Sequence, residues 1–363
     1  MNNSIINYLI LFLFTLSLFN CGSAEKDISQ TTQRTPSEEE KFLSNLPSYI
    51  TRVTHFGQRA NWSHDGRKIL FVERTYGDVY EVTLETGVIR PVTHHYYHEG
   101  YVRANYLSNG DILLSGAPNF DSENPGASRH TNAELWVLDK SLDKPPVPLG
   151  TKCSEGAAVS RTNMTIAWAV DDRASEELPE QSTKIWMADI NYEDGTPKLE
   201  NKKLLIDSRD HSFRLKGRLE TQDFRSPNEK ELIFTAYAVD YSSADVMGIN
   251  LETNEITNYT SSPLYEEPEG IYPSGKFTLV ESDRHNGKGP GFIDIYKLTL
   301  DESGQMERLT FFNDNPNFKS SNPAVSDDGR YMAFQMAKIG DPAGVGRGLF
   351  IYNFEEANVN RTE

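Results

Sequence analysis

The fold is decided by a stretch near the start of the folded region, Ala60-Asn61-Trp62-Ser63-His64-Asp65-Gly66-Arg67-Lys68-Ile69-Leu70-Phe71-Val72. Two apolar segments flank a polar Asp-Gly pair. Glycine adopts a positive φ at low cost, so Asp-Gly between apolar runs is typical of a tight hairpin turn. Two further strand-like segments follow at 77–82 and 87–93. Together these segments predict a unit of four antiparallel strands.

The unit recurs along the chain. Each further copy places a polar turn before an apolar strand, and these strands are 112–114, 165–168, 232–234, 278–280 and 332–334. A four-stranded unit cannot bury both of its faces alone, so such units stack around a common axis. The six repeats therefore predict an all-β fold, a six-bladed β-propeller with four-stranded antiparallel blades.

The two ends of the repeat region predict how the ring closes. The sixth unit stops after its third strand, at Ile351-Tyr352-Asn353. The missing strand is found at the other end, where Ile50-Thr51-Arg52-Val53-Thr54-His55 matches Ile89-Arg90-Pro91-Val92-Thr93-His94. We expect the N-terminal strand to complete the last blade, because this pairing removes an exposed sheet edge.

The turn sequence also carries a family resemblance. Ser63-His64-Asp65-Gly66-Arg67 and Ser326-Asp327-Asp328-Gly329-Arg330 share the pattern Ser-x-Asp-Gly-Arg ahead of an apolar strand. This pattern resembles the repeat of TolB-like β-propellers, and the resemblance covers nearly all of residues 49–354. It implies the propeller fold and leaves the activity open.

The N-terminus is typical of an exported protein. Residues 5–19 are largely apolar, like the core of a signal peptide. The following Leu18-Phe19-Asn20-Cys21-Gly22-Ser23 resembles a bacterial lipoprotein cleavage box, which implies a lipid on Cys21. An ordinary secretory signal or an uncleaved anchor is the alternative. We expect a signal peptide over 1–21, a flexible tether over 22–48, the propeller over 49–354 and a tail over 355–363.

This organisation places the protein in the cell envelope, as an outer-membrane or periplasm-facing lipoprotein held to the membrane through its lipid alone. The charge excludes another class of partner. Asp and Glu total 53 against 36 Lys and Arg, a net charge of −17, which argues against binding nucleic acid. With Cys21 lipidated, Cys153 has no disulfide partner, and we expect it to be a buried thiol.

Acidic residues recur just before the inner strands, at Glu99, Glu155, Glu220 and Glu269. In a blade with strands a to d counted outward from the axis, the b–c and d–a loops share one face, because strand direction alternates. These four side chains are therefore expected at the mouth of the central channel. Clustered carboxylates could serve as metal ligands or as an acid–base pair, or they could line a water-filled channel.

The same loops hold further candidates. His98 and His285, with Glu99, could bind a divalent ion, although histidines that lie in surface loops by chance explain the pattern equally well. Arg284 suits a carboxylate such as that of a uronic acid, and a salt-bridged loop is the alternative.

Roles are assigned as follows. The candidate catalytic residues are His98, His285, Arg284 and Glu269. The candidate substrate-binding residues are Glu99, Glu155, Glu220, Tyr101, Arg59 and Asp283. The candidate metal ligands are His98, His285 and Glu99.

Three functions from different classes fit these features, and the third is a scaffold for envelope assembly. The first is a binding module that holds a glycan or an envelope protein over the channel mouth. The alternative is a carbohydrate-active enzyme, a polysaccharide or oligosaccharide lyase or a glycoside hydrolase, with a divalent metal ion as the candidate cofactor. The overall design is similar to that of oligogalacturonate lyases, which have a propeller, a histidine-rich metal site and an arginine that reads a carboxylate. The sequence leaves open whether the protein is an enzyme.

Overall fold

The computed structural model describes residues 35–360, except 302 and 343. The predicted signal peptide and Cys21 lie outside this part of the chain. The chain divides into two units, Met1–Asn45 and Leu46–Glu363.

The described part of the first unit contains one short helix, α1 (Glu38–Leu43). Ser37 and Glu40 form a capping box, because the Ser37 hydroxyl accepts from the Glu40 N–H at 3.1 Å and the Glu40 carboxylate accepts from the Ser37 N–H at 2.6 Å. The predicted tether therefore includes a capped helical turn.

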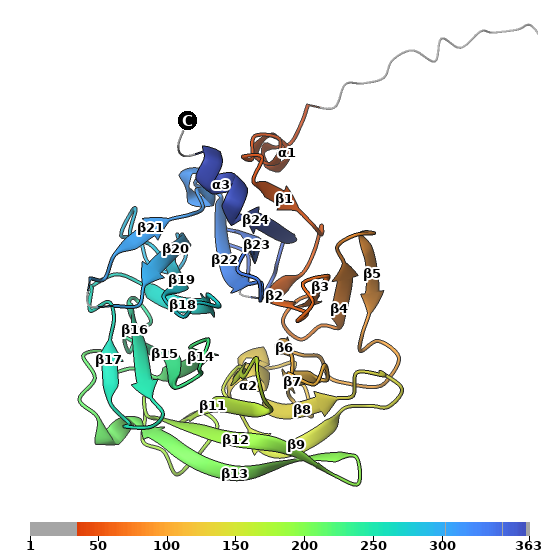
Figure 1. The fold of residues 1–363 in the computed structure, drawn as a ribbon, viewed down its shortest axis with the longest axis vertical. Coiled ribbons are helices and arrows are strands. Elements are labelled where there is room, and N and C mark those ends of the chain that lie inside the picture. The colour runs from red at the N-terminus through yellow and green to blue at the C-terminus, as the bar shows by residue number, and fades with distance from the viewer. Residues whose placement is uncertain (1–34, 302, 343, 361–363) are drawn as a thin grey trace, which may run out of the picture. The chain divides into compact units, whose positions relative to one another are not determined.

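The second unit is a ring of six four-stranded antiparallel sheets (Figure 1). Blade 1 consists of β2 (Gln58–Trp62), β3 (Lys68–Val72), β4 (Val79–Thr83) and β5 (Val88–Pro91). Blade 2 consists of β6 (Arg103–Tyr106), β7 (Ile112–Gly116), β8 (Glu134–Leu138) and β9 (Val147–Lys152). Blade 3 consists of β10 (Ala157–Val159), β11 (Thr165–Asp171), β12 (Thr183–Glu193) and β13 (Thr196–Asp207).

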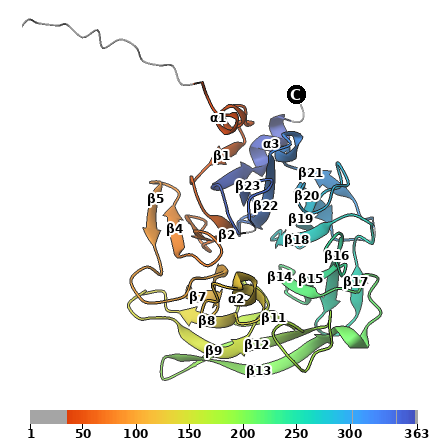
Figure 2. The ribbon, with the colours of Figure 1, turned by 180° about the vertical axis from the view of Figure 1, so that it is seen from behind.

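The other three blades complete the ring. Blade 4 consists of β14 (Leu219–Phe224), β15 (Glu231–Tyr237), β16 (Ala244–Asn250) and β17 (Ile256–Asn258). Blade 5 consists of β18 (Glu266–Ile271), β19 (Phe277–Ser282), β20 (Asp294–Thr299) and β21 (Met306–Arg308). Blade 6 consists of β22 (Phe318–Val325), β23 (Tyr331–Lys338), β24 (Leu349–Asn353) and β1 (Ile50–Arg52). Figure 2 shows the ring from behind, and in both views β2, β14, β18 and β22 lie nearest the axis.

Blade 6 confirms the predicted closure of the ring. Its sheet order is β1-β24-β23-β22, and Thr51 of β1 lies opposite Ile351 of β24. We call the pairing of β1 with β24 the seam. Two hydrogen bonds stabilise its end: the Val53 N–H donates to the Leu349 carbonyl at 2.7 Å, and the Leu349 N–H donates to the Thr54 hydroxyl at 2.9 Å.

The repeated turn explains why the Ser-x-Asp-Gly pattern recurs. The Ser63 hydroxyl donates to the Asp65 carboxylate at 2.7 Å, and the Gly66 N–H donates to the Ser63 carbonyl at 2.9 Å. Gly66 has a φ of 68°, in the left-handed region that side chains disfavour. Gly329, in the corresponding turn of blade 6, has a φ of 71°.

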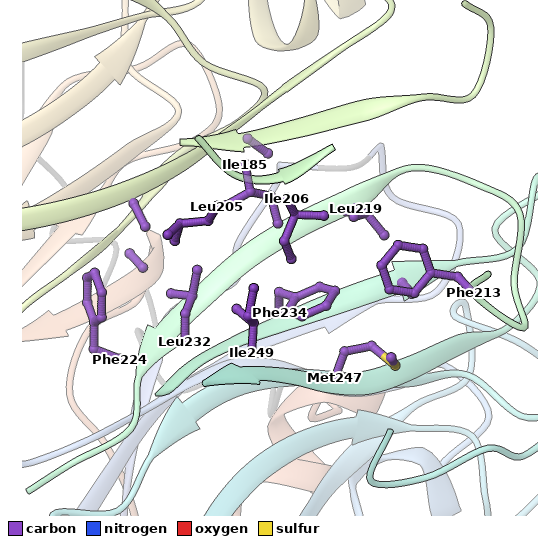
Figure 3. Packing of buried hydrophobic residues seen from close by; sticks show 14 residues of the cluster. Ile185, Leu205, Ile206, Phe213, Leu219, Phe224, Leu232, Phe234, Met247 and Ile249 are labelled. Carbon is purple, nitrogen blue, oxygen red and sulfur yellow. The ribbon is translucent and has the colours of Figure 1, made fainter. Parts of the chain in front are cut away.

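The hydrophobic core lies between neighbouring blades. Figure 3 shows one such layer, in which Ile185 and Ile206 of blade 3 face Leu219, Leu232 and Phe234 of blade 4. These five side chains are buried. Burying apolar surface stabilises the fold by roughly 25 cal/mol per Å², so stacking stabilises each blade through its neighbours.

Short helices lie in the connections. They are α2 (Pro125–His130), η1 (Ser208–Asp210), η2 (Phe312–Asp314) and α3 (Phe354–Asn360). Helix α3 occupies most of the predicted tail, and the Asn353 side chain accepts from the N–H groups of Glu355 and Glu356 at its start. Within the described residues, no helix combines the length and apolarity that crossing a membrane requires. Cys153 is a buried free thiol, as predicted, and burial raises its pKa.

Candidate functional site

The central channel is divided into two basins. The upper basin, of about 380 Å³, opens on the face of the b–c and d–a loops and takes lining residues from all six blades. The lower basin, of about 90 Å³, opens on the face of the a–b turns. Arg59, Arg103, Glu269 and Asn322 line both, so these side chains form the partition between them.

Contacts between arginines and buried glutamates hold the partition together. Arg103 donates a hydrogen bond to Glu220 at 2.9 Å and lies 3.7 Å from Glu269. Arg59 and Arg129 both donate to the same carboxylate oxygen of Glu155. Arg129 comes from helix α2, so the b–c loop of blade 2 reaches inward to the channel.

Local backbone features place the two central arginines. Arg59 lies in a β-bulge of β2 with a φ of 55°, and its N–H donates to the Gln335 side chain at 2.7 Å. Arg103 passes over Gly156, where an added Cβ would lie 2.5 Å from its Cδ. A side chain at position 156 would therefore displace the Arg103 side chain.

The environment lowers the pKa of one buried carboxyl and raises the pKa of two others. Burial disfavours the charged form of Glu155, but Arg129, Arg59 and Arg103 hold its pKa well below the usual range. Burial is also the main cause at Glu220 and Glu269, where it combines with the charges of neighbouring glutamates to raise each pKa to about 8. The channel therefore contains one firmly ionised carboxylate beside carboxyls that keep a proton near neutral pH.

Two further acids extend this group along the wall of the upper basin. Glu267 accepts hydrogen bonds from the hydroxyls of Tyr237 and Tyr265. Glu281 accepts from the Asn322 N–H at 2.5 Å. Burial and neighbouring glutamates raise the pKa of both carboxyls to about 7.

Several buried polar atoms at the basin have no hydrogen-bond partner among the described residues. They are Nε and Nη1 of Arg59, Nε of Arg103, Nε of Arg129 and Nδ1 of His130. Burial lowers the pKa of His130 to about 4, so this imidazole is neutral at pH 7.

Contacts between blades bridge the mouth of the lower basin. His64 bonds to the Asp327 carboxylate at 2.9 Å and to the Leu107 carbonyl at 3.1 Å, which joins the turns of blades 1, 2 and 6. Arg161 of blade 3 lies 3.3 Å from Asp327 and reaches backbone carbonyls of blades 5 and 6. At this end of the channel, polar side chains link neighbouring blades to one another.

The structure brings together only part of the predicted site. Glu155, Glu220, Glu269 and Arg59 meet in the channel. Glu99 instead accepts from the exposed Tyr97 hydroxyl, in the d–a loop after blade 1. Tyr101 is buried against the ring of His98, with 4.8 Å between ring centres, so it packs in the core rather than facing a ligand.

The predicted metal ligands are occupied elsewhere. Nδ1 of His98 accepts from the Gly100 N–H at 2.9 Å, and its Nε2 meets Asp78 at 2.8 Å. His285 bonds to the Tyr296 hydroxyl at 3.2 Å and to the Asn313 side chain at 3.1 Å.

The two histidines share no partner, and both use both ring nitrogens internally. Within the described residues, no group of three or more His, Cys, Asp or Glu side chains is arranged to hold a metal ion. His98, His285 and Glu99 therefore do not form the expected metal site.

The neighbours of His285 also have internal partners. Arg284 pairs with the buried Glu266 at 2.8 Å. Asp283 is buried and accepts from the N–H groups of Tyr265 and Gly289. These contacts are the salt-bridged alternative, and Asp283, Arg284 and His285 line neither basin, although Pro290 of the same loop lines the upper one.

Five residues of the channel group were missed by sequence reasoning: Arg103, Arg129, Glu267, Glu281 and Tyr237. A signal for one of them was present. Arg59-Ala60-Asn61-Trp62 and Arg103-Ala104-Asn105-Tyr106 are the same segment in successive repeats, so the choice of Arg59 implies Arg103. The other four come from strand and loop positions that share no repeated sequence.

Comparison with known proteins agrees on the fold. A TolB from Agrobacterium tumefaciens is similar, with a TM-score of 0.50 and 14% identity over 75% of this chain and 96% of that one. An oligogalacturonate lyase from Vibrio parahaemolyticus has a TM-score of 0.46 and 12% identity, over 85% of this chain and 94% of that one. A TolB from Acinetobacter baumannii has a TM-score of 0.41 and 14% identity, over 79% of this chain and 67% of that one.

No protein-family model matches the chain, and no curated protein matches it. Likeness at this level of identity concerns the fold alone. The second unit is thus a six-bladed β-propeller, as the repeats predicted, and its fold is similar to that of TolB.

Proposed function

We propose that this protein is a binding module of the cell envelope, which holds a glycan or a protein partner over the loop-face mouth of its channel. The observation that carries the proposal is the upper basin, a polar hollow of about 380 Å³ to which every blade contributes. This volume lies in the range of small-ligand pockets, about 300–1,000 Å³. The lower basin is smaller, at about 90 Å³, and contacts between blades bridge its mouth.

The rim of the same face offers apolar contact area. Among the described residues, the large hydrophobic side chains exposed in b–c or d–a loops are Tyr97, Phe120, Val239, Phe311 and Val345. Exposed apolar residues around a polar hollow favour contact with a larger partner, while the basin itself takes a small polar group.

Photocrosslinking in cells tests the binding face. We expect p-benzoylphenylalanine to form adducts when it replaces Tyr97 or Val239, which are 86% and 52% exposed on the loop face. The matched control replaces Tyr192, which is 40% exposed at the end of β12 on the opposite face. Adducts from Tyr192 alone, or from none of the three positions, would contradict the proposal.

A carbohydrate-active enzyme is the second candidate, and one observation favours it. A low pKa at Glu155 beside raised pKa values at Glu220 and Glu269 separates a base from an acid, which is the arrangement of many acid–base pairs. Incubation with polygalacturonate would then release unsaturated products or new reducing ends, and Glu269→Gln would abolish the release. Equal rates for the wild type and this variant would exclude this role for Glu269.

The lipid anchor on Cys21 is part of the proposal and rests on the residues around it. Labelled palmitate should be incorporated into the wild-type protein and not into Cys21→Ser, and the variant should leave the membrane fraction. Cys153→Ser is the matched control, since the Cys153 thiol is buried. Undiminished labelling of Cys21→Ser would refute the anchor.

A further inference from the structure

We propose that the upper basin recognises a small ligand through a carboxylate group, which binds Arg59 on the floor of the basin. This inference deepens the proposed binding function and rests on it. In this proposal Arg59, rather than Arg284, binds the carboxylate of the ligand.

The first argument is the unused hydrogen-bonding capacity of the floor. The Arg59 side chain is only 10% exposed, yet its Nε and Nη1 have no acceptor among the described residues. Arg103 and Arg129 each leave Nε without an acceptor as well. Buried N–H groups are nearly always paired in folded proteins, so acceptor atoms of a ligand or of water are expected at this place. Arg59 lines the basin, so a ligand that enters from the loop face can reach it.

The second argument is the balance of charge. Three guanidinium groups meet here, and two of them share one oxygen of Glu155. Burial raises the pKa of Glu220 and Glu269 to about 8 and that of Glu267 and Glu281 to about 7, so Glu155 is the one carboxylate of this group that the arginines hold well below its usual pKa. Water could satisfy the free N–H groups but would add no negative charge. A carboxylate does both, because its two oxygens match the planar fork of a guanidinium.

Backbone geometry supports Arg59 as the anchor. Its φ of 55° is unusual for a residue other than glycine, and the Gln335 side chain holds its N–H in place. A bulge that costs backbone strain is often found where a side chain is aimed at a functional site. The strain is explained if the bulge directs Arg59 into the channel.

The carboxylate could belong to a sugar acid or to a peptide C-terminus, and the two sources share this chemistry. Four probes separate them by titration calorimetry on the purified full-length protein: galacturonate, neutral galactose, triglycine and triglycine amide. We expect at least one acid to bind at least about tenfold more tightly than its neutral counterpart, a ratio typical of a site built around one charged group. The acid that binds identifies the source.

Matched variants test the residue. Arg59→Gln should weaken binding of that acid at least about tenfold, whereas Arg284→Gln should leave it unchanged. Both substitutions remove one positive charge, and Arg284 lies outside the basin. Arg59→Lys keeps the positive charge but loses the planar guanidinium group, so we expect an affinity between those of the wild type and Arg59→Gln. This variant replaces Arg59→Gln in the test if Arg59→Gln does not fold. Thermal melting of each variant without ligand shows whether it is folded.

Several outcomes would overturn the inference. One is a neutral probe that binds as well as its acid. Another is loss of binding in Arg284→Gln with retention in folded Arg59→Gln or Arg59→Lys. If none of the four probes binds while crosslinks form at Tyr97 or Val239, the carboxylate site is wrong and the proposed binding function stands. If an acid binds through Arg59 and no crosslinks form, the larger partner is wrong and the carboxylate site stands.

Discussion

Among single residues, the buried glutamates of the channel make stability depend on pH. Glu269 has a pKa raised from 4.5 to about 8 by burial and by the charges around it. Between these two values the folded state keeps a proton that the unfolded state releases. The free energy of unfolding therefore falls as pH rises from about 4.5 to 8, and it is unaffected by this group below that window.

Replacing this carboxyl should flatten the pH profile. We expect Glu269→Gln to lose less stability than the wild type between pH 5 and 9, by on the order of 1–3 kcal/mol. Thermal melting across this range measures the effect. Glu193→Gln is the control, because the Glu193 side chain is 69% exposed at the end of β12. A profile unchanged by Glu269→Gln would mean that Glu269 is ionised in the folded protein.

The same residues show how far the sequence predicts the site. The alternation of strands places Glu155, Glu220 and Glu269 on one face, and they meet because that rule depends on topology alone. His98 and His285 follow the same rule but turn to local partners, a Gly100 N–H and a Tyr296 hydroxyl. Such short-range hydrogen bonds depend on side-chain rotamers and on loop conformations that no pattern of residue types encodes.

At the next scale, the elements of the ring were predictable because each has a strong local signal. Asp-Gly turns fix where hairpins lie, and the missing strand of the sixth unit predicts the role of β1. The bulge in β2 has no such signal, although it sets the direction of Arg59. The Ser37-x-x-Glu40 pattern of a capping box is present in the sequence, but a flexible tether was predicted there and the structure has a short helix.

Strand β1 is the element whose loss should matter most. It is three residues long, and it supplies the outer strand of blade 6. Replacing Ile50, Thr51 and Arg52 together by glycine removes the buried Ile50 side chain and loosens the strand, so we expect a loss of at least about 2–5 kcal/mol.

Urea unfolding measures this loss, and size-exclusion chromatography detects aggregation through the freed edge of β24. The control is the same replacement at Thr31, Thr32 and Gln33, in the predicted tether. If the β1 variant unfolded at the wild-type urea concentration, the ring would not need β1 to close.

For the molecule as a whole, the seam is where the ring can open. Thr51 and Ile351 are opposite each other in an antiparallel pair, a geometry that a disulfide can bridge. Thr51→Cys with Ile351→Cys would close a loop of about 300 residues, and the chain-entropy relation gives stabilisation near its upper limit, about 5 kcal/mol.

A second pair of cysteines, placed within one blade, serves as the control. It distinguishes stabilisation by closing the ring from stabilisation by any disulfide. Thr83 and Val88 face each other across the β4–β5 turn, so their cysteine pair closes only a short loop. We expect the seam disulfide to raise the melting temperature more than the hairpin disulfide does, and reduction to reverse both. Equal gains would mean that unfolding does not begin by opening the seam.

The two strands of the seam are synthesised at very different times. Thr54 and Leu349, whose hydrogen bond helps to fasten it, are 295 residues apart in the chain. At a synthesis rate of roughly 5–20 residues per second, β1 waits about 15–60 s before its partner strand exists. During that wait the nascent protein presents open strand edges, which are templates for aggregation. The delay between the first strand and the last therefore sets how long these strand edges remain open.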